Sequence, residues 1–311
     1  MSTMDEKQGI TPYQKNDSFA GYHPVVNFLY FVAVIGFAMF FMHPVSLAIS
    51  FLWGAVYAVY LKGKKALRVG LLYMLPLLIF TAILNPMFNH QGITILAYLP
   101  NGNPLTLESI MYGIAAAGML VTVITWFSCF NVVMTSDKII YLFGRIIPAL
   151  SLILSMALRL VPRFRAQIKI ISNAQKGIGQ DVSSGNIYQK AKHGIKILSI
   201  MVTWALENAI ETADSMKCRG YGLPGRTAFS IFRFHRRDGY ALGYIFICVA
   251  IVITGAATGA YHFRYFPSIQ GQWSGPYTIG VFAAYFALGA FPVFINLYSE
   301  ARLWKHIESK I

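Results

Sequence analysis

Charge and cysteine are both scarce in this sequence. Only 12% of its residues are charged, against about a quarter in soluble domains, while 56% are hydrophobic. Its three cysteines, Cys129, Cys218 and Cys248, are far apart, and their spacing excludes a disulfide framework and a cysteine metal site. The composition therefore favours one polytopic membrane protein with reduced, structural thiols over two soluble domains.

Three signatures of function are also missing. The mostly polar residues 1–24 lack the apolar core of a cleaved signal peptide, so we expect a short disordered tail. Neither "GQDVSSG" nor "KGKK" fits the P-loop pattern, so ATP has to bind another chain, and we expect no cofactor in this one. No paired carboxylates stand inside the apolar runs, since Glu108 and Asp137 flank the fourth run. Proton- or sodium-coupled carriers usually need such groups at membrane depth.

Apolar runs make up most of the chain. A membrane-spanning helix needs ~20 apolar residues, and a proline such as that of His43-Pro44 ends or kinks a helix. On these criteria we predict an all-α polytopic membrane protein with about six transmembrane helices, at about 25–42, 45–61, 69–84, 109–134, 240–260 and 277–297.

Lysine and arginine indicate which loops face the cytoplasm. Of 26 such residues, 16 lie between Lys138 and Arg237 beside only four acidic residues, and none lies between Asn85 and Glu108. We therefore predict a cytoplasmic tail at 1–24, transmembrane helices at 25–136, a cytoplasmic block at 137–237 and a C-terminal transmembrane pair with a short tail at 238–311. Both termini are then cytoplasmic, and the chain is a multi-pass protein of the plasma membrane.

The apolar run at 139–161 leaves the number of spans open. It is long enough to cross a bilayer, but a crossing would move the basic block outside and bury Arg145 and Arg159, at ~2.5–3.5 kcal/mol each. We expect this run to lie at the inner membrane surface or inside the bundle, with a full span as the alternative.

The basic block is predicted to contain amphipathic helices. Pro162 is expected to interrupt the first apolar stretch, so that a helix begins near it and ends at Gly177 and Gly179. A long helix follows from about Tyr188 to Cys218, with Gly220 in the left-handed position after its end. Some cations of the block would attract anionic headgroups of the lipid bilayer. Its apolar helix faces leave no groove for a nucleic acid.

Arg219 has two interpretations on this pattern alone. A cation in the last helical turn is stabilised by the helix dipole by ~0.3–1 kcal/mol, and Arg219 could pair there with Asp214. Alternatively, the small neighbours Cys218 and Gly220 let the surface of a soluble partner approach, and the guanidinium binds a carboxylate through two hydrogen bonds.

Several segments of the chain resemble a known family. "ADSMKCRGYG" at 213–222 is similar to the second Ala-Arg-Gly motif in the T components of energy-coupling factor transporters, with Cys218 in place of alanine. "ALRLVPRF" at 157–164 and "ISNAQKGIG" at 171–179 resemble the stretch leading through the first motif. "NPMFNHQGITIL" at 85–96 resembles an outward loop of some members, and the whole resemblance covers about 25–240.

The resemblance implies partners and a mechanism. T components are membrane scaffolds of importers for vitamins or metal ions, whose coupling helices dock two ABC ATPases and cradle a substrate-binding S component. Arg219 would be the second docking arginine, flanked by Cys218 and Gly220. The resemblance further assigns a first docking site to Ala174, Gln175, Gly177, Ile178 and Gly179, and the geometry of the block to Arg159, Pro162 and Arg163.

The first motif departs from the family pattern, because Gly177, Ile178 and Gly179 replace Ala-Arg-Gly. Docking there would rest on shape, on Ile178 filling a pocket or on Lys176, or the two ATPases differ and only one needs the arginine. The rivals to a scaffold are a stand-alone secondary transporter or channel and a membrane-bound enzyme. An enzyme would need a cluster of catalytic polar residues, which the sequence does not display.

Overall fold

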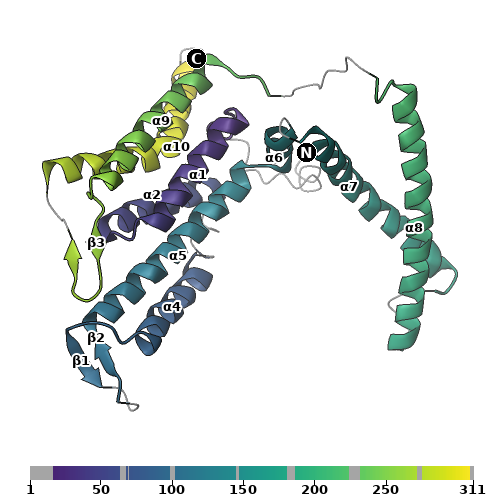
Figure 1. Ribbon diagram of the computed structural model, residues 1–311. Helices are drawn as coiled ribbons and strands as arrows, with labels where there is room; N and C mark the ends of the chain where they lie inside the picture. The colour runs from purple at the N-terminus through teal and green to yellow at the C-terminus, as the bar shows by residue number, and fades with distance from the viewer. Residues whose placement is uncertain are drawn as a thin grey trace. The chain divides into compact units, whose positions relative to one another are not determined.

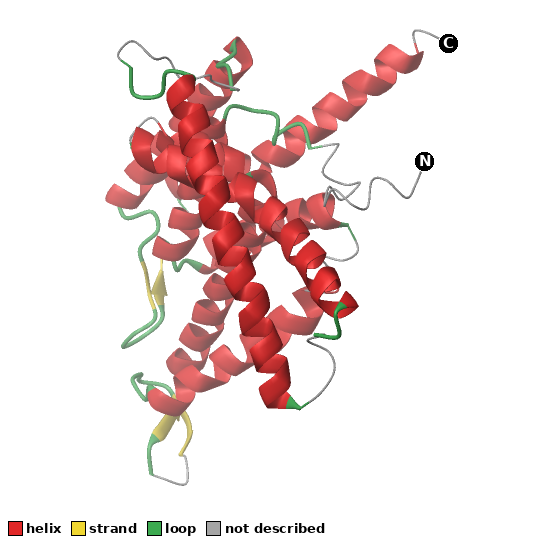
Figure 2. Cartoon of the chain, turned by 90° about the vertical axis from the view of Figure 1, so that its right-hand side faces the viewer, coloured by secondary structure: helices red, strands yellow, loops and turns green. Residues whose placement is uncertain are grey.

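A computed structural model describes residues 17–63, 68, 70–98, 102–144, 147–180, 186–223, 232–271 and 275–308, and most of their secondary structure is helical (Figure 2). The chain divides into two compact units. The first combines the segments before Asp137 and after Ile231, and the second is Asp137–Ile231.

The first unit is a bundle of apolar helices (Figure 1). Helix α5 packs against α1, α2 and α4, while α10 packs against α2 and α9. The elements are α1 (Pro24–Phe40), α2 (Pro44–Lys62), the π-helical turn η3 (Gly70–Met74) continued by α4 (Leu75–Phe88), α5 (Leu107–Val133), α9 (Arg236–Ala257) and α10 (Pro276–Glu308).

Four helices of this bundle are long and apolar enough to cross a membrane: α2, α5, α9 and the Pro276–Ala301 part of α10. Helix α1 and the segment Leu72–Phe88 are apolar but shorter. Helix α1 has 17 residues, which is near the lower limit of ~17 for a span. The predicted all-α polytopic fold is confirmed, and these six apolar helices overlap the six predicted spans.

Two short β-hairpins lie in the connections between the helices. Strand β1 (Ile95–Tyr98) pairs antiparallel with β2 (Pro104–Thr106), and β3 (Phe263–Arg264) pairs antiparallel with β4 (Gln270–Gly271).

Helices α1 and α2 both begin at the proline of a His-Pro pair. In both, the histidine Nδ1 accepts a hydrogen bond from the second helical N–H, with His23 bound to Val25 at 3.3 Å and His43 to Val45 at 3.2 Å. The His-Pro dipeptide therefore begins each helix.

Close helix crossings occur at glycines. A Cβ on Gly113 of α5 would lie 2.7 Å from the carbonyl oxygen of Ala82, and one on Gly255 of α9 would lie 2.5 Å from Val281 Cγ1 of α10. Helices in membranes pack through such small residues because backbones can then approach closely. Gly113 is therefore a point of close contact between α5 and α4.

The start of α1 and the C-terminal parts of α2 and α10 lie together at one face of the bundle. Asp17 accepts hydrogen bonds from Tyr57 on α2 at 3.0 Å and from the Asn296 side chain on α10 at 2.8 Å. The Tyr60 hydroxyl on α2 donates to Glu300 on α10 at 2.7 Å. These contacts place the segment before α1 beside the C-terminal parts of α2 and α10.

The same face holds the start of α9, which Asp238 fixes. One carboxylate oxygen accepts from the backbone N–H of His23 at 3.1 Å and the other from that of His235 at 2.8 Å. Arg237 also donates to the Gly21 carbonyl at 2.9 Å. A single carboxylate, 1% exposed, therefore caps both α1 and α9.

The loops between α1 and α2 and between α9 and α10 lie at the opposite face, together with the start of α5. The Tyr265 hydroxyl, in the segment between α9 and α10, donates to the carbonyl of Met42 between α1 and α2 at 2.8 Å. Its ring packs against Tyr112 near the start of α5 at 5.5 Å. The cation-free segment 85–108 ends there, so it shares a face with the loop between α9 and α10.

Two local predictions in this unit were wrong. Phe19, expected in a disordered tail, is fully buried against the rings of Tyr30 and Tyr57 because the segment from Asp17 is anchored to the bundle. The third span was expected to end at about residue 84, but α4 continues to Phe88 with Pro86 inside it. The Asn85 side chain donates to the Ser109 carbonyl of α5 at 2.8 Å, so a tertiary contact holds this last turn.

The second unit contains α6 (Ser136–Gly144), α7 (Pro148–Gly177) and α8 (Ile187–Cys218). The predicted long helix matches α8, but the predicted break at Pro162 was wrong, since α7 is continuous through it. An interior proline costs about 3 kcal/mol, which a cooperative 30-residue helix tolerates. The 139–161 run is divided between α6 and α7, and α7 is not among the candidate spans. Arg145 lies outside the described residues.

Candidate functional site: the ends of helices α7 and α8

Helices α7 and α8 form an antiparallel pair held by an apolar cluster. Ile171 of α7 is buried with Ile197 and Met201 of α8. Two turns away, the rings of Phe164 and Trp204 meet edge to face at 5.6 Å. The earlier residue on α7 meets a later residue on α8, so the two helices run antiparallel.

Of the three residues expected to set the geometry of this unit, Arg163 contacts the helix pair. Its guanidinium lies 5.8 Å from the centre of the Trp204 ring, which is within cation–π range. Arg159 and Pro162 are exposed on α7. Arg163 therefore lies over the Trp204 ring that also contacts Phe164.

Helix α7 ends in a Schellman cap. The N–H of Gln180 donates to the carbonyl of Gln175 at 2.9 Å, and the N–H of Gly179 donates to that of Lys176 at 3.1 Å. Gly179 has a φ of 78°, the left-handed conformation that this cap requires at C′. Ile178 is the last residue before that glycine and its side chain is 63% exposed.

Helix α8 ends in the same way. The N–H of Tyr221 donates to the carbonyl of Met216 at 3.0 Å, and the N–H of Gly220 donates to that of Lys217 at 2.9 Å. Gly220 has a φ of 80°, which confirms its predicted left-handed position. Arg219 stands where Ile178 stands in α7, and it is exposed.

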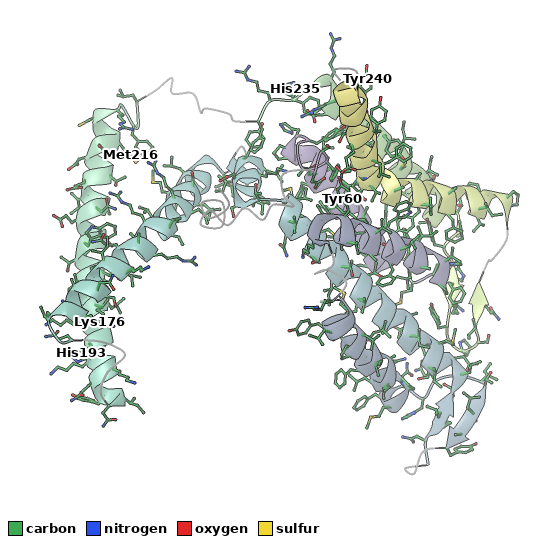
Figure 3. The ribbon with its side chains drawn as sticks, turned by 180° about the vertical axis from the view of Figure 1, so that it is seen from behind. Tyr60, Lys176, His193, Met216, His235 and Tyr240 are labelled. Carbon is green, nitrogen blue, oxygen red and sulfur yellow. The ribbon has the colours of Figure 1, made fainter. Side chains whose placement is uncertain are left out.

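The predicted docking residues fall into two separate groups. The α7 group comprises Ala174, Gln175, Gly177, Ile178 and Gly179, of which only Gln175 is half-buried; the α8 group comprises the exposed Cys218 and Arg219 and the half-buried Gly220. Because the helices are antiparallel, Lys176 lies near His193 while Met216 lies at the other end of α8 (Figure 3). At 1.5 Å per residue, the two capped ends are about 40 Å apart along α8.

The two caps differ in chemistry although they share geometry. Both have lysine two residues before the cap position, at Lys176 and Lys217. The cap position itself holds an isoleucine in one and an arginine in the other. Ile178 and Arg219 are both exposed beside a glycine, but of these two side chains only the guanidinium can bind a carboxylate through two hydrogen bonds.

The sequence did not single out the α7–α8 contact as a functional element. Ile197, Met201, Trp204 and Asn208 recur at helical spacing and are the better covered residues of α8. A second set of apolar side chains on α8 includes Leu206 at 62% and Ile210 at 64% exposure. Both stripes are apolar, so periodicity alone could not show which one faces α7.

Comparisons with known proteins identify this class. A bundle of apolar helices, four of them long enough to cross a membrane, is the organisation of a multi-pass membrane protein. The chain belongs to the family described as CbiQ, cobalt transport protein, whose model matches residues 18–229. The resemblance to energy-coupling factor T components is thereby confirmed.

The most informative relatives are all named energy-coupling factor transporter transmembrane protein EcfT. The protein of Lacticaseibacillus paracasei is 37% identical over 105 residues, or 33% of this chain and 40% of that relative. The protein of Listeria monocytogenes, designated EcfT 1, is 34% identical over 106 residues, or 34% and 38% of the two chains. The Staphylococcus aureus protein is 25% identical over 243 residues, or 72% and 88%.

Proposed function

We propose that this chain is the scaffold that couples ATP hydrolysis by two separate ABC ATPases to substrate uptake through an S component. The observation that carries the proposal is the pair of matching caps, which present Ile178 and Arg219 at exposed helix ends. A helix that ends in exposed side chains beside a left-handed glycine suits insertion into a groove. The chain has no P-loop pattern, so the nucleotide belongs to the partners.

The S component would lie on the outer apolar stripe of α8. These side chains recur every three or four residues and are each more than half exposed, although the opposite side of α8 packs on α7. Water is a poor environment for so continuous a stripe, whereas a membrane-embedded partner would cover it. The stripe consists of Ile195, Leu198, Val202, Leu206 and Ile210. The S component would also select the cargo, a vitamin or a metal ion.

The second unit would face the cytoplasm, together with both chain termini, in the plasma membrane. The chain enters this unit after α5 and leaves it before α9, at the bundle face that holds the start of α9. The basic loop after α2 follows from the same face, and lysine and arginine favour the cytoplasmic side. Cys218 tests this orientation, because it is the exposed one of the three cysteines. A membrane-impermeant maleimide should label Cys218 in inside-out vesicles and not in intact cells. Labelling in intact cells would contradict the scaffold function, since no cytosolic ATPase could reach that end.

Docking is tested by co-purifying the chain with ABC ATPases of its organism. Wild type should retain them, and Arg219→Glu should weaken retention about thirtyfold or more, since a lost interfacial charge pair costs 2–5 kcal/mol. Lys196→Glu is the matched control, because it reverses an exposed cation on the same helix far from its end. Substrate uptake by this chain alone in liposomes would refute the proposal.

A further inference from the structure

The start of α9 carries exposed arginines that have no acidic neighbour in their own segment. Arg233 and Arg236 are both exposed. Asp238 is the only acidic residue between 215 and 299, and its buried carboxylate already accepts two backbone N–H groups. The positive charge of the two guanidiniums is therefore available to a partner outside this segment.

The other described carboxylates at this face are engaged by α2 and α10. Asp17 accepts hydrogen bonds from Tyr57 and from Asn296, and Glu300 accepts one from Tyr60. These contacts are made by tyrosine and asparagine side chains, and they involve neither of the two exposed arginines.

Aromatic contacts hold the segment before α9 against the start of α1. The Phe234 ring meets the His23 ring edge to face at 5.3 Å. Arg237 donates the hydrogen bond described above, and its guanidinium lies 5.2 Å from the centre of the Tyr22 ring. Arg237 is thus bound to the bundle itself, and the same contacts fix the backbone that carries its two arginine neighbours.

An exposed stripe continues from Arg236 along α9. Tyr240, Ile247 and Ile251 follow it at intervals of four, seven and four residues, which places the four side chains on one face of the helix. All four are exposed, and Tyr240 is the most exposed of the three uncharged ones at 79%. Figure 3 shows Tyr240 at the same end of α9 as His235. The stripe therefore runs from cation to tyrosine to aliphatic side chain.

We propose that this face of α9 binds an anionic phospholipid. Arg233 and Arg236 hold the headgroup phosphate, Tyr240 lies at the boundary between headgroup and hydrocarbon, and an acyl chain lies along Ile247 and Ile251. Guanidinium groups bind phosphate through paired hydrogen bonds, and tyrosine is enriched at membrane interfaces. This lipid site goes beyond ATPase coupling, and it would fix the depth of α9 where the chain returns from the second unit.

The geometry of α9 favours a lipid over a soluble anion. Helix α9 is one of the candidate spans. Ile247 lies about 16 Å from Arg236 along the helix axis, which is inside the hydrocarbon of the leaflet when Arg236 lies at its surface. A free phosphate would contact the arginines only, whereas a phospholipid also covers the apolar part of the stripe. Because two cations converge without an acid, a headgroup of net negative charge fits better than a zwitterionic one.

The experiment uses the full chain in phosphatidylcholine nanodiscs. A bimane fluorophore is attached at Ala250→Cys in a Cys218→Ser background, because Ala250 is exposed beside the stripe and Cys218 is the exposed one of the native cysteines. Brominated acyl chains quench the fluorophore on contact. A minor fraction of brominated phosphatidylglycerol should quench it more strongly than the same fraction of brominated phosphatidylcholine, since only the first carries a net negative charge.

Charge variants test which side chains hold the headgroup. Arg236→Gln should lower the preference for phosphatidylglycerol about fivefold, as expected for one cation near an anionic surface, and Arg236→Lys should retain most of it. Arg264→Gln is the matched control, because it removes an exposed arginine on β3 at the opposite face. Raising NaCl from about 0.1 M to 1 M should also reduce the preference, since the screening length falls from about 10 Å to 3 Å.

Two results would overturn the site: equal quenching by the two brominated lipids with all arginines present, or an equal loss of preference in Arg236→Gln and Arg264→Gln. Glycerophosphoglycerol, the same headgroup without acyl chains, should not compete at the concentration of the lipid. Competition by it would assign the arginines to a soluble anion and refute the lipid. Because ATPase retention is measured separately, failure of this site leaves the proposed function standing.

Discussion

Ile178 and Arg219 occupy the same position in two equivalent Schellman caps. Each precedes a glycine with a φ near 80°, and each lies two residues after a lysine whose carbonyl accepts the N–H of that glycine. The antiparallel pairing of α7 and α8 sends these ends in opposite directions, about 40 Å apart by helix rise. One unit thus displays two matched but chemically different ends.

The left-handed glycines should be sensitive to substitution. Gly179→Ala and Gly220→Ala should each destabilise their cap by about 1–2 kcal/mol, because a Cβ disfavours the left-handed conformation. Gly177→Ala is the control, since Gly177 is helical with no atom near its added Cβ, and it should stabilise α7 by about 0.5–1 kcal/mol. Amide hydrogen exchange at 175–180 and 216–221 measures both effects. Equal responses of Gly177 and Gly179 would contradict the cap.

Removing the Trp204 ring should separate α7 from α8. Trp204→Ala deletes the contact with Phe164 and the surface beneath Arg163, at about 2–3 kcal/mol for a partly buried aromatic. Leu198→Ala, on the exposed side of α8, should change stability by less than about 0.5 kcal/mol. Faster amide exchange around Ile171 in the first variant alone is the expected result. Unchanged exchange there would show that the cluster does not hold the helices together.

Asp238 should stabilise the first unit through two helix starts. Asp238→Ala leaves the N–H groups of His23 and His235 without their acceptor, at about 1 kcal/mol for each cap. Asp214→Ala removes an exposed carboxylate on α8 and serves as the comparison. Thermal unfolding in detergent should show a lower midpoint for Asp238→Ala. Equal midpoints for the two variants would argue against the shared cap.

The helix start at α1 should become less stable in acid because His23 caps it. Burial lowers the pKa of His23 below its usual value, and the carboxylate of Asp238 opposes part of this shift. The unfolded chain then binds the proton more readily, so the contribution of His23 is full above about pH 6.5 and is lost as pH falls through the lowered pKa. Protonation also removes the Nδ1 acceptor for Val25.

His23→Asn tests this dependence, because asparagine keeps a side-chain acceptor at the cap and does not titrate. Unfolding midpoints measured at about pH 7.5 and pH 5 should differ less in this variant than in wild type, since the two residues share the cap but not the charge. An identical pH dependence in both proteins would assign the effect to other groups.

Much of the fold could be predicted because its signals are local. Span length, the His43-Pro44 break and the glycines after α7 and α8 all follow from rules that act within a few residues. The failures involve contacts that are distant in sequence. The Asn85 side chain donates a hydrogen bond to the Ser109 carbonyl of α5, and Phe19 is buried by rings from α1 and α2. The prediction for Pro162 was wrong because the rule that proline ends a helix neglects the cooperativity of a helix of 30 residues.

The candidate site divides in the same way. The sequence indicated Arg219, Ile178 and their glycines, but it did not show that the two caps are equivalent, because that rests on backbone hydrogen bonds. Nor did it show which apolar stripe of α8 faces α7, since two stripes have similar periodicity.

By itself the sequence determined which segments are apolar, where helices end and which side chains stand at those ends, because helix stops and bilayer length act through neighbouring residues. Only the tertiary structure decided that Asp238 binds His23, 215 residues away, and so joins the starts of α1 and α9, and that the ends of α7 and α8 point in opposite directions. Both depend on packing between segments remote in the chain, which local patterns do not encode.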